Sequence, residues 1–323
     1  MGKIKVIRSA VSSLPSAGII KLLQENDFYV IGSDITEKSA GRLLVDDFFI
    51  VDKAVDANKA TVCEQYLENI QKTKAKWIIS GPENEIVLLS SFEQQLLSVG
   101  CRLFHPGQDT LEKITDKYIL NNALKGKVPL KPLCMLEEYS VNKDSFEGQK
   151  LVVKPRKGRG SNGVHILQKN SEDMRRLQES LPPNEYIVQE FIPGQEYSVD
   201  CLFDNQGGLL NAVVRERLAV DSGVVIISRT IRKERILEYI SGISSVFSFR
   251  GFNCIQFREH EGDYFLTDIN PRIGGGSILS LRASDCMLSN FISLLRNEDD
   301  KLVHNNFDVK DKTMYRYYEE IYE

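Results

Sequence analysis

The stretch from Phe252 to Gly276, FNCIQFREHEGDYFLTDINPRIGGG, constrains the fold of this chain more than any other. Two apolar-rich runs flank Glu261-Gly262-Asp263, a pattern that predicts a β-hairpin with a three-residue loop. A loop of that length sets the register of the two strands. The expected cross-strand pairs are His260 with Tyr264, Arg258 with Leu266, and Gln256 with Asp268.

Three oxygen-bearing side chains, those of Gln256, Asp268 and Asn270, share one face of this predicted hairpin. Oxygen ligands without cysteine or histidine favour a hard cation such as Mg²⁺ or Mn²⁺. Arg272 follows two residues later, where it could meet an anion beside the metal, and a glycine triplet lets the backbone approach the ligand. The alternative at this point is an ordinary solvated hairpin followed by turn residues.

Composition excludes several classes of protein. The 323 residues are enough for two or three domains, and 42% hydrophobic with 27% charged residues is typical of a globular protein. A formal net charge of −4 argues against a nucleic-acid binder. Six cysteines without CxxC spacing indicate reduced thiols, and no apolar run is long enough to span a bilayer. We therefore expect a cytoplasmic protein without a membrane partner.

Residues 1–105 alternate strands with helices, which predicts a parallel sheet in a Rossmann-like arrangement. The expected strands are IKVI, FYVIGSD, DDFFIVD and KWIISGPE, and the expected helices are 16–24 and 59–73. The first turn, RSAVSSLPSAG, does not match GxGxxG, which argues against a dinucleotide. Ligands in such sheets bind beyond the carboxyl ends of the strands. Residues 9–13, Asp34 and residues 80–83 are therefore candidate substrate contacts, with ordinary loop roles as the alternative.

A glycine-rich basic loop lies within LVVKPRKGRGSNGVHIL, between expected strands over 151–154 and 164–167. Its glycines (Gly158, Gly160 and Gly163) and Ser161 could turn backbone N–H groups toward an anion. Lys154 closes the first strand, where its ammonium could reach phosphate oxygens. The loop does not match GxxxxGK[ST], and a flexible basic hairpin tip is the alternative.

Further expected elements surround these motifs. A helix beginning at Asp109 carries Thr115-Asp116-Lys117-Tyr118, and helices are expected over 233–249 and 277–297. YIVQEFIPGQEYSVDCLFD predicts strands over 186–192 and 197–203, with Glu196 placed to accept hydrogen bonds from a ribose. Arg215 and Arg217 lie on another strand, where they could hold a substrate carboxylate or pair with acidic neighbours. Beyond residue 110 the chain predicts an α+β pattern.

Four segments in this order, TDKY, VVKPRKGRGSNGV, VQEFIPGQEYSV and NCIQF…TDINPR, resemble the motifs of the ATP-grasp superfamily. The resemblance covers the whole chain and implies three parts. A Rossmann-like pre-ATP-grasp domain would span 1–105, ATP-grasp subdomain A would span 106–185, and subdomain B would span 186–323.

The resemblance also implies roles for individual residues. Lys117 and Lys154 would contact ATP phosphates beneath the 158–163 loop. Adenine would meet backbone atoms of Glu190 and Ile192, and Glu196 would bind the ribose. Gln256, Asp268 and Asn270 would bind Mg²⁺, and Arg272 would stabilise the transferring phosphoryl group. The family usually has Glu at the position of Asp268, which leaves the number of metal ions open.

The implied activity is an ATP-dependent ligase that joins a small-molecule carboxylate to an amine. Gln256 makes the set most similar to carbamoyl-phosphate-synthase-like members, where Gln is common at that position. A chain of 323 residues is too short for a large chain with two ATP-grasp halves, so a stand-alone relative is expected. The alternatives are an ATP-grasp kinase and a non-catalytic ATP-binding module. A homodimer through the first domain is expected by analogy only.

Overall fold

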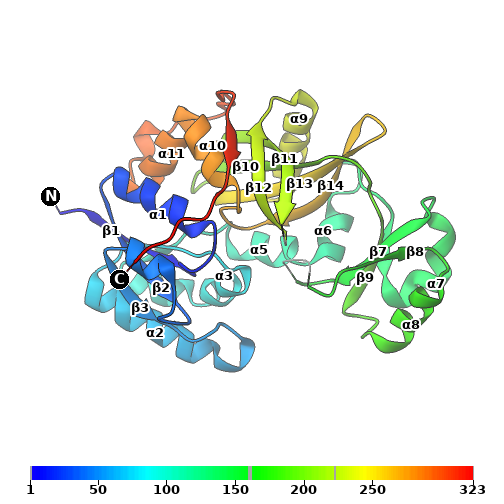
Figure 1. Ribbon diagram of the computed structural model, residues 1–323, viewed down its shortest axis with the longest axis horizontal. Helices are drawn as coiled ribbons and strands as arrows, with labels where there is room; N and C mark the ends of the chain where they lie inside the picture. The colour runs from blue at the N-terminus through cyan, green and yellow to red at the C-terminus, as the bar shows by residue number, and fades with distance from the viewer. Residues whose placement is uncertain (1, 159–161, 222, 323) are drawn as a thin grey trace.

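The computed structural model describes residues 2–158, 162–221 and 223–322. The chain forms three β-sheets that pack against helices (Figure 1), and the strands of the small antiparallel sheet precede those of the large one in the sequence. A parallel sheet forms one end of the molecule, a large antiparallel sheet the middle, and a small antiparallel sheet the other end. The candidate site lies where the second and third sheets face each other.

The first sheet has five parallel strands in the order β3-β2-β1-β4-β5. The strands are β1 (Ile4–Ser9), β2 (Phe28–Asp34), β3 (Asp47–Ile50), β4 (Trp77–Ile79) and β5 (Arg102–Leu103). The helices among them are α1 (Ser16–Glu25), α2 (Lys59–Thr73), α3 (Glu83–Ser90) and α4 (Glu93–Ser98). The parallel pairing expected for residues 1–105 is confirmed. The sequence could show it because apolar runs buried on both faces are typical of parallel strands.

Alternate residues of β1 point into two different cores. Val6 packs with α1 and with the last helix of the chain, α11 (Asp285–Arg296). Ile7 packs with α2, α3 and α4 on the other face. The C-terminal helices α10 and α11 therefore cover, together with α1, one face of the N-terminal sheet (Figure 1). This shared core joins the parallel sheet to the rest of the molecule.

The second sheet has six antiparallel strands in the order β14-β13-β10-β11-β12-β15. The strands are β10 (Glu196–Phe203), β11 (Leu209–Asp221), β12 (Val224–Thr230), β13 (Gly251–His260), β14 (Asp263–Asn270) and β15 (Thr313–Tyr315). One face packs against three helices, α5 (Gln108–Ile114), α6 (Lys117–Ala123) and α9 (Glu234–Ser244). Alternating apolar residues of β10 and β13 supply the sheet's side of this core.

The third sheet has four antiparallel strands in the order β6-β9-β7-β8. The strands are β6 (Leu133–Met135), β7 (Lys150–Pro155), β8 (His165–Gln168) and β9 (Tyr186–Glu190). Its helices are α7 (Tyr139–Asn142) and α8 (Glu172–Ser180), whose Tyr139 and Met174 pack against Leu151 and Val188 of the sheet.

Several elements differ from the expectations, and each difference has a local cause. The helix expected over 277–297 is two helices, α10 (Ser277–Ala283) and α11, because Ser284 has an extended backbone and caps α11 through its side chain. The helix expected over 233–249 ends at Ser244. The helix expected to carry Thr115–Tyr118 ends at Ile114, and Asp116 begins a new one.

Among the described residues, no single helix has both the length and the apolar composition needed to cross a bilayer. The pair α10 and α11 meets these two criteria together, but the two helices are bent by 107° relative to each other.

The C-terminal segment is fixed to the large sheet beside the candidate site. β15 pairs with β12, and the Arg316 backbone N–H donates to Ile226. The Arg316 guanidinium donates to three carbonyl oxygens, those of Gly275 at 2.6 Å, Leu14 at 2.9 Å and Val225 at 3.3 Å. One side chain therefore joins the first βα loop, the glycine triplet and β12.

A short linker with Gly194 joins β9 to β10 and so connects the third sheet to the second. Gly194 has a φ of 101°, and a Cβ at this position would lie 2.0 Å from the Glu259 carbonyl oxygen. We expect Gly194→Ala to lower the free energy of unfolding by at least about 2 kcal/mol, because backbone strain and a clash with fixed backbone add together.

The matched control for that variant is Gly262→Ala. Gly262 also has a positive φ, of 80°, but nothing lies within 4 Å of its Cβ position. The control should therefore lose only the cost of the strained backbone, about 1 kcal/mol. Equal stability of both variants in urea unfolding would contradict the clash at Gly194.

Candidate active site

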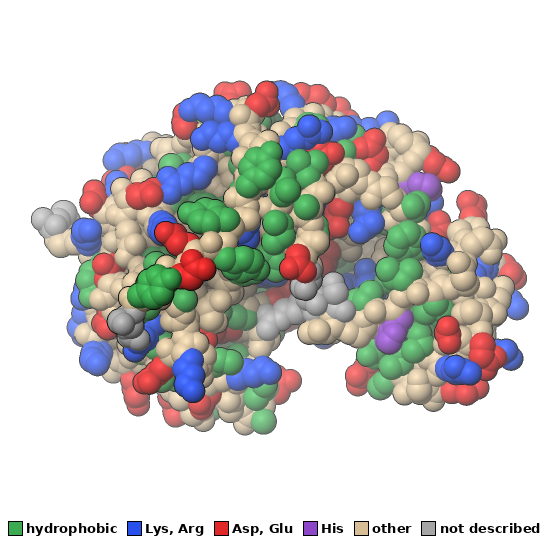
Figure 2. All heavy atoms as spheres, in the orientation of Figure 1, with side chains coloured by type: hydrophobic (Ala, Val, Ile, Leu, Met, Phe, Trp, Pro, Cys, Tyr) green, Lys and Arg blue, Asp and Glu red, His purple; other side chains and the backbone are tan. Residues whose placement is uncertain are grey.

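A cavity of about 590 Å³ lies between the second and third sheets. Figure 2 shows the surface hollowed between these two parts of the molecule. Strands β7 and β8 line one side, and β10 to β14 line the other. Most of the residues singled out from the sequence line it, namely Lys117, Lys154, Gly158, Glu190, Ile192, Glu196, Gln256, Asp268, Asn270 and Arg272.

The hairpin of β13 and β14 brings the three oxygen ligands together. Gln256 lies opposite Asp268, as predicted, and Asn270 lies opposite Cys254. All three oxygen-bearing side chains line the cavity. The Asp268 Oδ1 accepts the backbone N–H of Ile269 at 3.0 Å, and no ion pair joins its carboxylate to another residue in the described part of the chain. This carboxylate therefore remains available to a cation.

The register elsewhere in the hairpin differs from the prediction. Arg258 lies opposite Phe265 instead of Leu266, and His260 lies opposite Asp263 instead of Tyr264. The turn has two residues, Glu261 and Gly262, with φ of 52° and 80°, which matches a type I′ turn. A β-bulge next to Gln256 places one extra residue, Thr267, on β14. The bulge offsets the shorter turn, so the pair that carries the site is unchanged.

The donor set suits a divalent cation held jointly by protein and ligand. In the described part of the chain, no three His, Cys, Asp or Glu side chains form a metal cluster. Gln256, Asp268 and Asn270 offer one carboxylate and two amide oxygens on one face. Mg²⁺ is commonly bound by one or two carboxylates together with substrate phosphates. These residues therefore fit Mg²⁺ in the presence of a phosphate ligand.

Lys154 faces this hairpin from the opposite sheet. Its side chain extends from β7 into the cavity. Burial lowers its pKa to about 8, the nearby Asp268 carboxylate opposes that shift, and Lys117 adds to it. Burial raises the free energy of the charged ammonium, and a polyanionic ligand beside it would lower that free energy again. Such a ligand would therefore be bound tightly.

The affinity of the protein for ATP, the nucleotide implied by the resemblance, should therefore depend on pH. In the unliganded protein Lys154 loses its proton as pH rises through about 8. Phosphates bind the protonated form, so affinity should be level below pH 8 and fall by up to about tenfold per pH unit above it. Calorimetric titration from pH 7 to pH 10 measures this. Lys154→Met should remove the dependence, whereas Lys150→Met, at the exposed start of the same strand, should preserve it.

Lys117 lies at the first turn of α6 and contacts the base of the glycine-rich loop. Its ammonium donates to the Gly158 carbonyl at 2.7 Å. Asp116 caps the helix by accepting the backbone N–H of Tyr118 at 3.1 Å, and it forms an ion pair with Arg156 at 2.8 Å. The Thr115–Tyr118 motif therefore forms the N-terminal cap of α6, and Asp116 and Lys117 each bind the glycine-rich loop segment instead of each other.

The glycine-rich loop is described only in part. Gly158 and Asn162 line the cavity. Gly163, with a φ of 68°, is not among the lining residues, and a Cβ at this position would lie 3.1 Å from the Pro155 Cγ. The predicted contacts of Gly160 and Ser161 lie outside the described residues.

The two acidic residues of the β9–β10 segment line the cavity, but both carboxylates are already paired. Lys131 binds Glu190 at 3.0 Å, and the Glu190 backbone N–H donates to Pro132. Glu196 is bound by Arg217 and, at 3.3 Å, by Arg258. A role of Glu190 or Glu196 toward a nucleotide stays a prediction.

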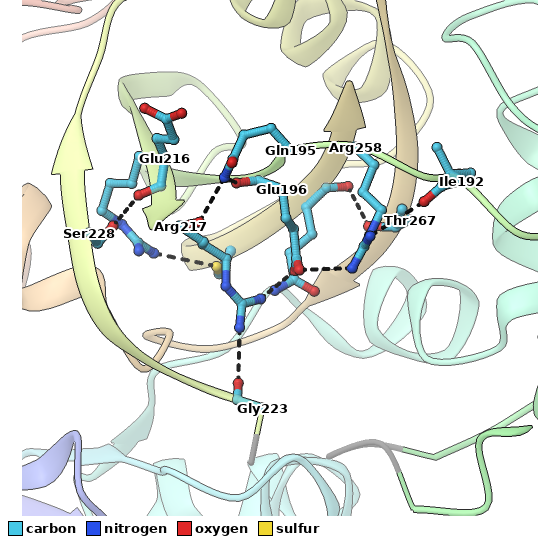
Figure 3. A network of polar contacts seen from close by, with 12 residues as sticks. Ile192, Gln195, Glu196, Glu216, Arg217, Gly223, Ser228, Arg258 and Thr267 are labelled. Atoms are coloured by element: carbon cyan, nitrogen blue, oxygen red, sulfur yellow. Dashed lines mark hydrogen bonds and ion pairs between the residues drawn. The ribbon is translucent and has the colours of Figure 1, made fainter. Parts of the chain in front are cut away.

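Arg258 and Arg217 form a polar network that the sequence did not reveal (Figure 3). Arg258 donates to the Ile192 carbonyl at 3.3 Å and so holds the linker between the sheets. Arg217 donates to the Gly223 carbonyl at 3.0 Å, near the tip of the β11–β12 hairpin. Glu196 lies between the two arginines. The network ties the linker and the hairpin tip to the same carboxylate.

Arg215 is an internal structural cation. It is 1% exposed and makes a bidentate contact with Asp200, at 2.7 and 3.1 Å. Ser277 and Ser280 donate to the same carboxylate, each at 2.6 Å. Burial would lower the pKa of Arg215, but Asp200 raises it above its usual value. Of the two alternatives for Arg215 and Arg217, the structure shows pairing with acidic neighbours.

Arg272 follows β14 and lines the cavity next to the oxygen ligands. Its Nε atom is buried and donates no hydrogen bond to the described residues, and no carboxylate among them pairs with it. A guanidinium with an unused donor beside a cation site is suited to bind an anion.

Lys154 on one sheet faces oxygen ligands and an arginine on the other, with Lys117 of α6 at the same cavity, and this arrangement suits a polyanion together with a hard cation. Residues 114–276, about half of the chain, match the model of the ATP-grasp domain. The protein belongs to the ATP-grasp family.

Two groups of curated relatives match shorter segments. The carbamoyl phosphate synthase large chain of Clostridium botulinum (strain Loch Maree / Type A3) is 28% identical over 137 residues, which is 39% of this chain and 13% of that protein. The D-alanine–D-alanine ligase of Thermotoga maritima is 36% identical over 93 residues, 28% of this chain and 30% of that protein. The matches thus cover less than a third of either relative.

Solved structures share the fold over nearly the whole chain. N5-carboxyaminoimidazole synthetase from Staphylococcus aureus has a TM-score of 0.72 at 16% identity, covering 98% of this chain and 84% of that one. The biotin carboxylase domain dimer of Hydrogenobacter thermophilus 2-oxoglutarate carboxylase, in complex with MgADP and bicarbonate, has a TM-score of 0.73 at 14% identity, covering 96% and 73%. At such identities the similarity establishes the ATP-grasp fold with its mixed α/β sheets and no more.

Proposed function

We propose that the protein is an ATP-dependent ligase that activates a substrate carboxylate and joins it to an amine or similar nucleophile. The observation that carries this proposal is the Asp268 carboxylate, without an ion pair among the described residues, facing the half-buried Lys154 across one cavity. The ligase and synthetase names among the relatives and neighbours support the same class of reaction.

In the proposed reaction a carboxylate oxygen of the substrate attacks the γ-phosphorus of ATP, and ADP leaves with the bonding electrons. The nucleophile then attacks the acyl carbon, phosphate leaves, and the proton of the nucleophile passes to solvent. The protein contributes positioning and charge neutralisation, since phosphoryl transfer needs little covalent help. Mg²⁺ or Mn²⁺ would neutralise phosphate charge when bound.

The chain's own residues divide this task between two sheets. From the third sheet, Lys154 would hold phosphate oxygens. From α6, which packs against the second sheet, Lys117 would do the same while it fixes the loop that begins at Gly158. From the second sheet, Gln256, Asp268 and Asn270 would hold the cation. Arg272 would neutralise the phosphoryl group as it moves, because its buried Nε has a free donor. Adenine contacts at Glu190 and Ile192 and a ribose contact at Glu196 remain part of the proposal.

We assign the parallel sheet the part of the pre-ATP-grasp domain, with proposed limits of 1–105, 106–185 and 186–323 for the three parts. The last two limits follow the sequence motifs and not the sheets, since β9 pairs with β6 and β7, and α5 and α6 pack against the six-stranded sheet. Its candidate substrate contacts lie at the carboxyl ends of β1, β2 and β4. Asp34 orders the first of these loops by accepting the backbone N–H of Ser12 at 2.8 Å. A cytoplasmic location and a homodimer also belong to this proposal, and a dimer among the structural neighbours is consistent with the latter.

The test is release of ADP from Mg·ATP in the presence of pools of carboxylates and pools of amines. A ligase should release ADP at full rate only when both partners are present. A stable phosphorylated product formed without an amine would replace the ligase by a kinase. ATP binding without stimulation by any pool would favour a non-catalytic module, and absence of ATP binding would refute the proposal.

A further inference from the structure

Arg8 is a buried cation at the carboxyl end of β1. It is 1% exposed, and its two described contacts are with neutral acceptors, the Ser16 hydroxyl at 3.3 Å and the Ile79 carbonyl at 3.2 Å. No carboxylate in the described part of the chain lies within ion-pair distance of it. Glu85 lies in the same buried polar cluster, where its Oε1 accepts the Ser80 hydroxyl at 2.6 Å. A cation that is this buried normally has an anionic partner.

The position of Arg8 is the one at which parallel sheets bind ligands. In the order β3-β2-β1-β4-β5, the direction of strand progression reverses between β1 and β4. Open α/β sheets bind ligands beyond the carboxyl ends of the strands at this switch point. Arg8 belongs to β1, and Gly81 belongs to the turn that follows β4. The two residues therefore flank the switch point.

Gly81 leaves one amino group of Arg8 uncovered. The Arg8 Nη2 atom would lie 3.2 Å from a Cβ on Gly81, and it donates no hydrogen bond to the described residues. Gly81 itself is half-buried, in a turn that reaches the surface. The absence of a side chain thus opens a path to an unused donor.

A second unused guanidinium comes from the ATP-grasp part of the chain. Arg272 lines the cavity, and its buried Nε has no partner among the described residues. Ser16, which accepts a hydrogen bond from Arg8, follows Pro15, and the Pro15 Cγ lies 3.8 Å from the Cβ position of Gly275, three residues after Arg272. Burial and, to a smaller extent, the positive charge of Arg272 lower the pKa of Arg8 to about 10, while Glu85 and Tyr66 oppose the shift. Among the described residues no acidic side chain forms an ion pair with either guanidinium, so an anion bound between the two would offset their repulsion.

We propose that Arg8 and Arg272 form an anion subsite at the switch point, which binds a carboxylate or phosphate group of the substrate. The inference rests on the proposed ligase function and narrows it. The carboxylate to be activated must lie at the γ-phosphate, beside Lys154 and Asp268. Arg8 is not among the cavity-lining residues, so a group that reaches it lies beyond Arg272. The substrate would therefore carry a second anionic group.

The test uses inorganic phosphate and acetate as probes, titrated by calorimetry at constant ionic strength with Mg·ADP saturating. Wild-type protein should bind at least one probe, and Arg8→Gln should bind it at least tenfold more weakly, the usual loss for a charge-assisted hydrogen bond. The affinity for Mg·ADP should change less than twofold. Binding of phosphate alone would indicate a phosphorylated substrate, and binding of acetate alone a dicarboxylate.

Two further variants make the test specific. Gly81→Ala keeps both arginines but narrows the path to Nη2, so it should also weaken the probe, and it decides the question if Arg8→Gln does not fold. Arg176→Gln removes an exposed arginine of α8 and should have no effect. The subsite is refuted if wild-type protein binds neither probe, or if both site variants bind it as wild type does. If wild-type protein did not bind Mg·ADP, that result would instead refute the proposed function.

Discussion

The Asp268→Ala variant is expected to release ADP at least about a hundredfold more slowly than wild-type protein, with its fold intact. Asp268 supplies the only carboxylate in the oxygen-ligand set of the β13–β14 hairpin. Loss of one contact of this kind commonly costs on the order of 3 kcal/mol in the transition state. ADP release under saturating Mg·ATP and the substrate pools measures the effect, and circular dichroism checks the fold.

The matched control is Asp263→Ala, on the same strand. Asp263 lies outside the cavity, where it binds Arg235 at 3.0 Å and Tyr239 at 2.7 Å. Its removal should change the rate less than threefold. If Asp268→Ala retained wild-type activity, the cation site would be wrongly placed. If the two variants lost activity equally, the loss would reflect damage to the hairpin instead of removal of a ligand.

The second large effect is on stability. Arg215→Met leaves the Asp200 carboxylate buried with only two serine hydroxyls and no cation. Breaking a buried ion pair in this way costs about 3–5 kcal/mol. At about 2 °C per kcal/mol for a chain of this size, the midpoint of thermal unfolding should fall by roughly 6–10 °C.

Two comparisons isolate the cause of that loss. Arg229→Met removes a half-exposed arginine paired with Glu216 on the same sheet and should cost less than about 1 kcal/mol. The double variant Asp200→Asn, Arg215→Met should regain part of the lost stability, because no uncompensated charge remains buried. A drop of the same size in Arg229→Met, or a double variant less stable than Arg215→Met, would contradict the argument.

Elements with a strong local pattern were predictable from the sequence. β2 (Phe28–Asp34) and α2 (Lys59–Thr73) have the predicted bounds, because a buried apolar run and an amphipathic segment are local signals. The Gln256–Asp268 pair was also predicted, although the turn is one residue shorter than expected. The bulge that compensates has no clear signature in the sequence, so the correct pair rested on two errors that cancel.

Features that depend on contacts distant in the sequence were not predictable. The acidic partner of Arg215 is Asp200 on the neighbouring strand, and only the register of β10 against β11 brings them together. The pairing of Glu190 with Lys131 and of Glu196 with Arg258 likewise depends on tertiary packing. Arg8 drew no attention because the sequence analysis placed it in the turn after IKVI, whereas β1 continues to Ser9, lies inside the sheet and has the Arg8 side chain enclosed.

The anchorage of Arg316 has a practical consequence for anyone who prepares this protein. Its guanidinium reaches the glycine triplet and β12, which line the cavity, and it also reaches the first βα loop. An affinity tag or fluorescent fusion placed soon after Arg316 would put a load on this anchor and so on the side of the cavity formed by β12 and the glycine triplet. Purification handles and surface-immobilisation chemistry are therefore better attached at the other end of the chain, where Gly2 is exposed and has nothing within 4 Å of its Cβ position.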